Sequence, residues 1–491
     1  MLAQTHASGC SLEGPRKNVI DVLQKRLDFY TAKSNRLRYA QNSHVPISRL
    51  PAETLSEVFL SLVESGIGDD DTSFTSGTFD FLRVCRRWNE VAVGFPRLWV
   101  WRIPGAVKAW PLFSTRSKGA PLFLTWRSVL PTPAQDFRMD PTIPERIHRL
   151  DFRGNIEPLA QFMDAFNSDA PSSVSSIRFY VINLDHSKRT KRLDRFFSSS
   201  FPKLVVFDID GFLPHSSSPI FTTSNLTSLK LRSHCYEKCR YTLSQLSEIL
   251  QQHPNLQELD LNEYALPLAG PSVPLVSLVL PRLVDLRLHG SMWGVVGLID
   301  LIGVSSPLHN IDIFIQESHS TPTPTPIGVV KKILAMHYEC PGLDCPRTTD
   351  HLDISSDSLG YCLSFDAGSR STSASHPTPN LKFCFTGLGA GGAYGLVEDT
   401  FPLLWPMDDV REFTVGGLKL SADVYRTILQ KMGGLLDLRL TVLEIEPVLD
   451  VLGVDHQGMC TRATKMISNN LYTRRWSASI IRPQTTIIVL F

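Results

Sequence analysis

A Leu-x-x-Leu-x-Leu pattern recurs along the middle of the chain and constrains its fold more than any other feature. Seven copies begin at residues 147, 174, 204, 226, 256, 283 and 308, so neighbouring copies start 22 to 30 residues apart. Leu226, Leu229 and Leu231 form the plainest copy. Each copy is a short apolar run typical of a buried strand. Weaker copies return at residues 410 and 435.

Helical segments are predicted between several of these strands, at 157–166, 244–252, 293–302, 328–337, 422–432 and 447–452. Strand and helix alternating at a period in the twenties is the leucine-rich-repeat signature, in which each unit covers the apolar face of the next. We therefore expect an α/β fold in which residues 140–455 form an irregular leucine-rich-repeat-like solenoid, with parallel strands on one face and helices on the other. An ordinary α/β domain with Leu-rich strands is the alternative.

The repeat is interrupted and its end is unusual. Two Pro/Ser/Thr-rich stretches, 319–326 and 369–379, are predicted to be loops, and the number of repeats between residues 314 and 409 stays open. Residues 461–491 form a basic tail, with five Lys or Arg and no acid between 461 and 482. Its last six residues, 486–491, are predicted to form a strand that either joins the sheet edge or is left unpaired.

Ahead of the repeats, residues 45–101 predict a pair of short helices. Pro51 suits the first turn of a helix, and Leu55, Val58, Phe59 and Leu62 follow at the spacing of one apolar stripe. A polar insert at 64–78, with three consecutive aspartates, separates this helix from the next. The second helix places Val84, Trp88 and Val91 on one face, with Leu82, Cys85 and Ala92 beside it.

The N-terminal region is predicted to be a disordered start at 1–15 and an amphipathic helix at 16–40. Val19, Ile20, Leu23, Leu27 and Tyr30 recur at three-and-four spacing, and basic residues cover the other side. With fewer than four heptads, packing of this helix onto the body of the protein is favoured over a short coiled coil.

The stretch 45–101 resembles the F-box, and in particular the F-box-like proteins of basidiomycete fungi. The resemblance rests on Leu50-Pro51-x-Glu53-x-Leu55-x-x-x-Phe59, on Val84-Cys85-Arg86-Arg87-Trp88-Asn89 and on Phe95-Pro96-x-Leu98-Trp99. The acidic insert is longer than in a minimal F-box, which leaves the strength of adaptor binding open.

The resemblance implies a substrate-recognition subunit of an SCF-type cullin–RING ubiquitin ligase. Its helices would bind the Skp adaptor, and through it a cullin, while the solenoid would bind a target protein that the sequence does not identify. Trp99 and Trp101 would pack the F-box onto the first repeat. The adaptor-facing and core residues that the resemblance assigns are Leu50, Pro51, Leu55, Val58, Phe59, Leu62, Val84, Cys85 and Trp88.

A second interpretation is a scaffold that works without a ligase and whose F-box-like helices only cap the solenoid, because the ends of a repeat stack need a polar cover.

A third interpretation is a nucleotide-dependent enzyme, and it rests on Gly387-x-Gly389-x-x-Gly392 alone. The segment after these glycines is a poor helix, whereas a dinucleotide loop needs a helix N-terminus there.

Other candidate sites are weak. His337, Cys340, Cys345 and His351 include two thiols and two imidazoles, but no Cys-x-x-Cys knuckle, so no zinc site is expected. The basic run 188–192 is read as a solvated loop rather than a nuclear import signal. We find no Walker loop, His-Glu-x-x-His or Gly-x-Ser-x-Gly motif, and therefore expect no enzyme activity, cofactor or metal.

Charge and composition narrow the class of protein further. A formal net charge of +1 over 491 residues gives no protein-wide attraction for nucleic acid. No apolar run approaches the roughly 20 residues of a membrane span. Nine scattered cysteines and the lack of a secretory leader predict reduced thiols in a cytoplasmic or nuclear protein.

Overall fold

A computed structural model gives the fold of the chain. It describes residues 13–65, 79–100, 110–128, 144–155, 173–182, 196–222, 225–233, 240–262, 265–267, 277–303, 308–316, 326–338, 351–356, 362–368, 380–386, 409–416, 420–435, 437–441, 476–479 and 488–490, with a few single residues between them. The chain divides into two compact units, Met1–Leu124 and Thr125–Phe491.

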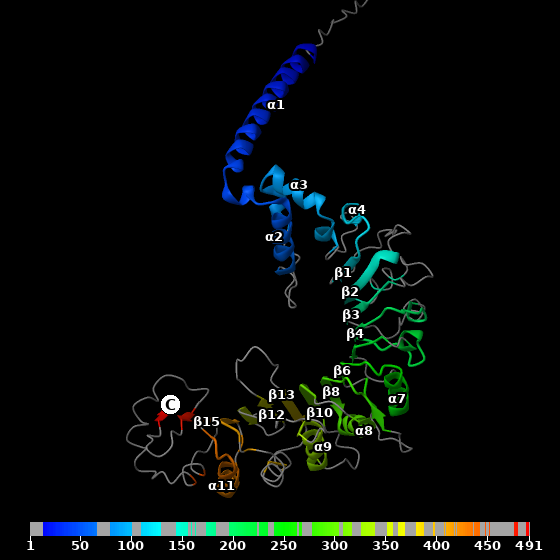
Figure 1. The fold of residues 1–491 in the computed structure, drawn as a ribbon, viewed down its shortest axis with the longest axis vertical. Helices are drawn as coiled ribbons and strands as arrows, with labels where there is room; N and C mark the ends of the chain where they lie inside the picture. Colours follow the sequence, from blue (N-terminus) through cyan, green and yellow to red (C-terminus); the bar gives the residue numbers. More distant parts are fainter. Residues whose placement is uncertain are drawn as a thin grey trace, which may run out of the picture. The chain divides into compact units, whose positions relative to one another are not determined.

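The first unit is helical, as predicted (Figure 1). The predicted N-terminal helix exists and is longer than 16–40, because α1 spans Glu13–Ser43. The first helix of the 45–101 stretch is α2 (Ala52–Ser65), which begins directly after Pro51. The other helices of the unit are η1 (Pro46–Arg49), η2 (Asp80–Arg83), α3 (Arg86–Gly94), η3 (Pro96–Trp99) and α4 (Trp110–Arg116).

Aromatic side chains form the core of the first unit. Phe59 stacks on Phe81 with ring centroids 4.5 Å apart and contacts Trp88 at 5.2 Å. Trp99 stacks on Phe79 at 5.5 Å, and its indole N–H donates to the Ala92 carbonyl at 2.8 Å. Trp101 lies outside the described residues, so the predicted packing of the two tryptophans onto a repeat stays a prediction.

The apolar stripe predicted for α2 is rotated around the helix. Leu55 and Phe59 are fully buried, as expected, but Leu62 is 51% exposed. Leu60 and Val63 are buried in its place. Spacing alone does not say which apolar residues of α2 face the core, because they lie on more than one side of the helix. The assignment of Leu62 to the adaptor-facing and core surface stays a prediction.

The second unit is built on one large, mostly parallel sheet. The seven strands predicted from the repeat all form and pair in sequence order. They are β2 (Ile147–Asn155), β3 (Ser176–Ile182), β4 (Val206–Asp210), β5 (Ser228–Arg232), β6 (Glu258–Leu261), β8 (Asp285–Ser291) and β10 (Asn310–Gln316). β1 (Leu122–Ser128) crosses the boundary between the units, and the short β7 (Leu278–Val279) and β9 (Ile302–Gly303) pair separately.

The repeat residues are in register from strand to strand, which explains why the repeat constrains the fold. Leu229 on β5 pairs with Phe207 on β4 and with Leu259 on β6, and all three are fully buried. Side chains alternate along a strand, so the second Leu of each copy joins the same buried layer. Four helices lie on the outer side of this curving sheet (Figure 1): α7 (Leu243–Gln251), α8 (Met292–Leu301), α9 (Pro326–Tyr338) and α11 (Ala422–Lys431).

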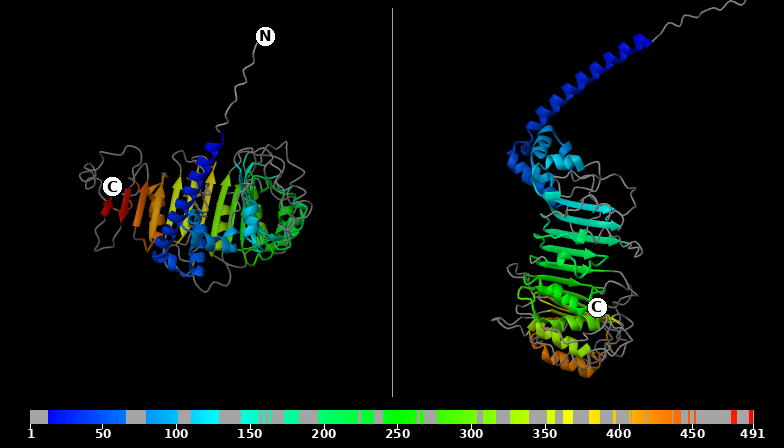
Figure 2. Two further views of the ribbon diagram at one scale, coloured as in Figure 1. Left: turned by 90° about the horizontal axis from the view of Figure 1, so that it is seen from above. Right: turned by 90° about the vertical axis from the view of Figure 1, so that its right-hand side faces the viewer.

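These four helices confirm the predictions for 244–252, 293–302, 328–337 and 422–432 to within two residues. In the right-hand view of Figure 2, the strands of the second unit stack side by side. The helices predicted at 157–166 and 447–452 and the loops predicted at 319–326 and 369–379 lie mostly or wholly outside the described residues.

The region between residues 314 and 409, where the repeat count was left open, contains three strands. They are β11 (His351–Ser356), β12 (Cys362–Gly368) and β13 (Asn380–Thr386). β13 pairs in parallel with β10, and β11 pairs in parallel with β14 (Glu412–Gly416). β12 lies between β13 and β11 and is antiparallel to both. The chain therefore enters this part of the sheet in reverse strand order.

The last strands close the sheet at its far edge. β14 pairs in parallel with β15 (Asp437–Thr441), where the two weak repeat copies were predicted. β16 (Trp476–Ser479) and β17 (Ile488–Leu490) then add in antiparallel fashion. The apolar end of the chain therefore joins the sheet edge, the first of the two outcomes expected for it.

Candidate protein-interaction site

The face of the sheet opposite the buried layer carries a row of charged residues in register. This row, which we call the charged row, takes the residue between the two last apolar positions of each of the seven repeat copies, together with Lys382, which pairs with the last of them. Its members are Asp151, Arg178, Asp208, Lys230, Asp260, Arg287, Asp312 and Lys382. Acid and base alternate without exception from β2 to β13.

Opposite charges on neighbouring strands stabilise a sheet by about 0.2–1 kcal/mol per pair, so the alternation favours this register over a slipped one. It continues to Asp366 on β12, which pairs with Lys382. It then breaks, because Asp366 lies opposite Asp353 on β11. The break coincides with the antiparallel insertion.

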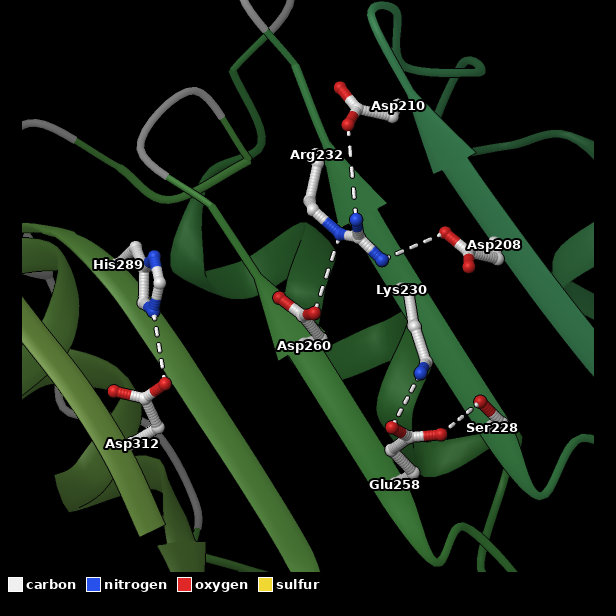
Figure 3. A network of polar contacts seen from close by, with 9 residues as sticks. All are labelled: Asp208, Asp210, Ser228, Lys230, Arg232, Glu258, Asp260, His289 and Asp312. Atoms are coloured by element: carbon white, nitrogen blue, oxygen red, sulfur yellow. Dashed lines mark hydrogen bonds and ion pairs between the residues drawn. The ribbon is translucent and has the colours of Figure 1, made fainter. Parts of the chain in front are cut away.

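One arginine beside the charged row forms ion pairs with three carboxylates (Figure 3). Arg232 on β5 lies 3.1 Å from Asp208, 3.8 Å from Asp210 and 3.3 Å from Asp260, measured from its nitrogens to their carboxylate oxygens. Each of the three contacts uses a different nitrogen of the guanidinium. This planar fork of donors suits several acceptors at once, as the single ammonium of lysine would not.

Burial shifts the pKa values of two of these carboxyls. The pKa of Asp208 is raised by burial, an effect that the positive charge of Arg232 offsets only in part. The pKa of Asp260 is raised for the same reason and with the same partial offset. One cation shared by three acids does not fully compensate their removal from water.

Two further pairs extend the polar layer on either side of this cluster (Figure 3). Lys230 lies 2.5 Å from Glu258, which also accepts a hydrogen bond from Ser228 at 2.8 Å. Burial opposes ionisation of Glu258, but these two hydrogen bonds and the lysine charge outweigh it and lower its pKa. His289 lies 3.8 Å from Asp312, and the interaction with His289 lowers the pKa of that carboxyl.

The acids and bases of the charged row differ in their pairing. Three of the four acids of the seven repeat strands have an arginine partner: Arg149 for Asp151, and Arg232 for Asp208 and Asp260. The fourth, Asp312, has His289 beside it. Among the bases, Lys230 is paired with Glu258. Arg178, Arg287 and Lys382 make no ion pair within 4.0 Å among the described residues, and Arg287 and Lys382 are exposed.

The strands β2 and β3 add a second basic feature at the start of the sheet. The Arg153 guanidinium lies over the Tyr180 ring, 4.9 Å from its centroid, and Tyr180 is partly exposed. The Nε of Arg178 is buried and has no hydrogen-bond partner in the described structure. Arginine beside an exposed aromatic ring is a combination enriched at protein interfaces.

The nine residues assigned to adaptor binding by resemblance fall into three groups in the structure. Leu55 and Phe59 are internal core. Leu50, Val58, Cys85 and Trp88 are half-buried, and the Leu50 carbonyl accepts a hydrogen bond from Arg87. Pro51, Leu62 and Val84 are exposed, with Leu62 at 51% and Val84 at 55%. Only the second and third groups have side-chain surface to offer a partner.

The candidate chemical motifs lie largely outside the described residues. This applies to Cys340, Cys345, the glycines at 387–392 and the basic run at 188–192. His351 is on β11, 3.9 Å from Glu412. Within the described ranges, no three His, Cys, Asp or Glu side chains gather in a way that would hold a metal ion. In that same part of the chain, no helix has the length and apolar character needed to cross a bilayer.

The charged row was not predicted, although its signal is present in the sequence. Counting the second-to-last residue of each repeat copy gives Asp, Arg, Asp, Lys, Asp, Arg and Asp over seven copies. Within a single copy these positions are only spacers between apolar residues, and the alternation is visible only when the copies are compared. No protein-family model matches the chain, and no curated protein matches it either.

Proposed function

We propose that the chain is a substrate-recognition subunit of an SCF-type cullin–RING ubiquitin ligase, with an F-box in the first unit and a leucine-rich-repeat-like solenoid in the second. The observation that carries this proposal is that the apolar residues of the helical pair fall into a buried set and an exposed set. Leu55 and Phe59 hold the pair together from inside, whereas Leu62 and Val84 leave apolar surface exposed. These two side chains keep about half of their surface exposed although the described helices around them share an aromatic core, which favours a partner for that exposed surface.

In this proposal the exposed and half-buried residues of α2 and α3 contact the Skp adaptor. The charged row of the second unit contacts the target protein. The role of the chain is to hold the target close to the ubiquitin-charged enzyme, because confinement raises the effective concentration of the reacting groups.

The charged row also supports a class of target. Its acids are paired within the sheet, and its unpaired cations are Arg178, Arg287 and Lys382 among the described residues. A partner that brings carboxylates to these three positions gains charge complementarity. We therefore propose a target with an acidic surface.

The experiment is complex formation between the full chain and the Skp adaptor, followed by size exclusion. We expect a one-to-one complex. Leu62→Ala and Val84→Ala should each weaken binding by roughly tenfold. A buried apolar side chain is worth about 1.5–3 kcal/mol, and only the exposed part of these two, 51% and 55%, is left for a partner to cover. Neither change should alter the melting temperature of the free chain by more than about 2–4 °C.

Phe59→Ala is the matched core variant, and it should lower both stability and binding. Binding that survives the Leu62 and Val84 changes but fails with Phe59 would mean that these exposed residues are not the contact. A folded, monodisperse chain that forms no complex would favour the scaffold that works without a ligase.

A further inference from the structure

The helix α1 exposes an unusual amount of apolar surface. It is 31 residues long, and the large apolar side chains described along it are 53–65% exposed: Val19, Ile20, Val22, Leu23, Leu27, Phe29, Tyr30, Leu37 and Tyr39. The helix α1 contacts η1, but among the described residues its apolar side is not packed onto the body of the protein as we expected. Many of these residues are β-branched or aromatic, which are only moderate helix formers. A helix of this composition needs its apolar side covered to be stable in water.

The exposed residues define a seam with coiled-coil spacing. Taking Ile20 as heptad position a, positions a and d between residues 20 and 37 are filled by Ile20, Leu23, Leu27, Tyr30 and Leu37, with Ser34 as one polar interruption. The a and d positions nearer the helix ends are polar, so the seam covers the middle of α1. Alternate steps of three and four keep such residues on one side of a helix and favour pairing with a second helix. A single polar residue in a seam fixes the register of the pair.

The charges beside this seam are all of one sign. Positions e and g flank the seam, and their charged residues are Lys17, Arg26, Lys33 and Arg38. The acids Asp21 and Asp28 both fall at position b, away from the contact. Residues at e and g set the choice of partner in coiled coils, because they meet the e and g residues of the facing helix.

This pattern argues against a second copy of the chain as the partner. In a parallel pair of α1 helices, Lys33 would face Arg38 of the other copy, and in an antiparallel pair the basic g positions would face one another. Like charges placed together work against the wrong partner. We propose that α1 is one half of a heterotypic coiled coil, and that its partner is an amphipathic helix with Glu or Asp beside its apolar seam.

The test uses the full chain and two designed probe peptides of about four heptads. Both carry Ile at a and Leu at d, and they differ only in having Glu or Lys at every e and g position. Fluorescence anisotropy of labelled probe should show the acidic probe binding at least about tenfold more tightly than the basic one, with the preference falling as salt is raised.

Variants of α1 make the result specific. Leu23→Ala with Leu27→Ala removes two seam residues and should abolish binding. Val22→Ala with Tyr39→Ala removes two residues of similar exposure at positions c and f, and should leave binding unchanged. Arg26→Glu, Lys33→Glu and Arg38→Glu together should transfer the preference to the basic probe.

Equal affinity for both probes, failure of the acidic probe to bind, or a preference unaffected by the charge reversal would overturn the proposal. So would a stable homodimer at micromolar concentration in sedimentation equilibrium. Because this experiment does not involve the Skp adaptor, its result is independent of the proposed ligase function.

Discussion

Arg232 lies closer to Asp208, its diagonal neighbour, than to Asp210, its direct neighbour in the sheet. The register pairs Asp210 with Arg232 and Asp208 with Lys230, yet the contact distances are 3.8 Å to Asp210 and 3.1 Å to Asp208. On the other side, Asp260 forms an ion pair with the same guanidinium, with 3.3 Å between its carboxylate oxygen and the Nε of Arg232. The arginine is thus drawn toward the charged row, and it joins β4, β5 and β6 through one side chain.

Replacing Arg232 with methionine should destabilise the second unit. Three carboxylates would lose their cation, and removing one partner of a buried ion pair costs about 3–5 kcal/mol. Arg232 keeps 31% of its side chain exposed, so we expect a smaller loss of about 2–3 kcal/mol in the free energy of unfolding, measured by urea denaturation. Arg287→Met removes an exposed cation of the charged row and should cost less than about 0.5 kcal/mol. Equal effects of the two changes would refute the special role of Arg232.

The stability of the second unit should depend on pH in opposite ways at two aspartates. Asp312 has a lowered pKa, so its ionised form stabilises the fold above the unfolded value of about 4, and this contribution disappears as the pH falls. Asp260 has a raised pKa, so its contribution is favourable at low pH and disappears as the pH rises above about 4.

Chemical denaturation of Asp312→Asn and Asp260→Asn between pH 3 and 7 checks this prediction. The advantage of the natural chain over Asp312→Asn should grow as the pH rises through about 4, whereas its advantage over Asp260→Asn should shrink. Slopes of the same sign in both variants would contradict the arrangement around Arg232 and His289.

Gly211, directly after β4, should not tolerate a side chain. Its φ is +108°, and a Cβ built there would collide with the carbonyl oxygen of Val181. Its N–H also donates to the Arg232 carbonyl at 2.8 Å. A shift of the backbone at Gly211 would therefore disturb this hydrogen bond to β5. Gly211→Ala should therefore lower the free energy of unfolding by about 1–3 kcal/mol.

Gly94, at the end of α3, is the matched control because nothing lies within 4 Å of a Cβ added there. Gly94→Ala should be neutral or slightly stabilising, since it reduces the freedom of the unfolded chain. Thermal melting of both variants checks this prediction. A melting temperature of Gly211→Ala equal to that of the natural chain would show that the backbone after β4 has room for a side chain at this position.

The proposed acidic target can be tested without knowing the target. Selection from a displayed pool of random peptides on the immobilised full chain should enrich Asp and Glu over Lys and Arg. Arg178→Glu, Arg287→Glu and Lys382→Glu together should remove the enrichment, and Asp208→Asn should keep it. Enrichment of basic or purely apolar peptides would contradict the role given to the charged row.

The sequence predicted the strands of the sheet better than it predicted which side chains are exposed. Buried strands depend on apolar residues that meet in register, and Leu229 with Leu259 is such a pair visible from spacing alone. The reverse order of β11, β12 and β13 was missed because it depends on which strands meet across a distance, and the short apolar runs there do not carry that information. Spacing also did not separate the apolar residues of α2 that face the core from those, such as Leu62, that stay exposed.

The charged row shows the opposite case, in which the sequence contains the alternation of acid and base but a single repeat copy does not show it. Alternating acid and base at Asp208, Lys230 and Asp260 is a pattern between repeats, not within one. Its meaning depends on a parallel register, which the structure supplies. The three-way contact of Arg232, by contrast, depends on side-chain directions that spacing does not predict.

The most direct measurement is amide hydrogen exchange of the full chain with and without the purified Skp adaptor. We predict that protection on complex formation is concentrated in α2 and α3, at 52–65 and 86–94, while the strands that carry the charged row are unchanged and remain available for a target. Protection confined to the sheet face, or no protection in a chain that stays folded, would contradict the assignment of the helical unit as an adaptor-binding F-box.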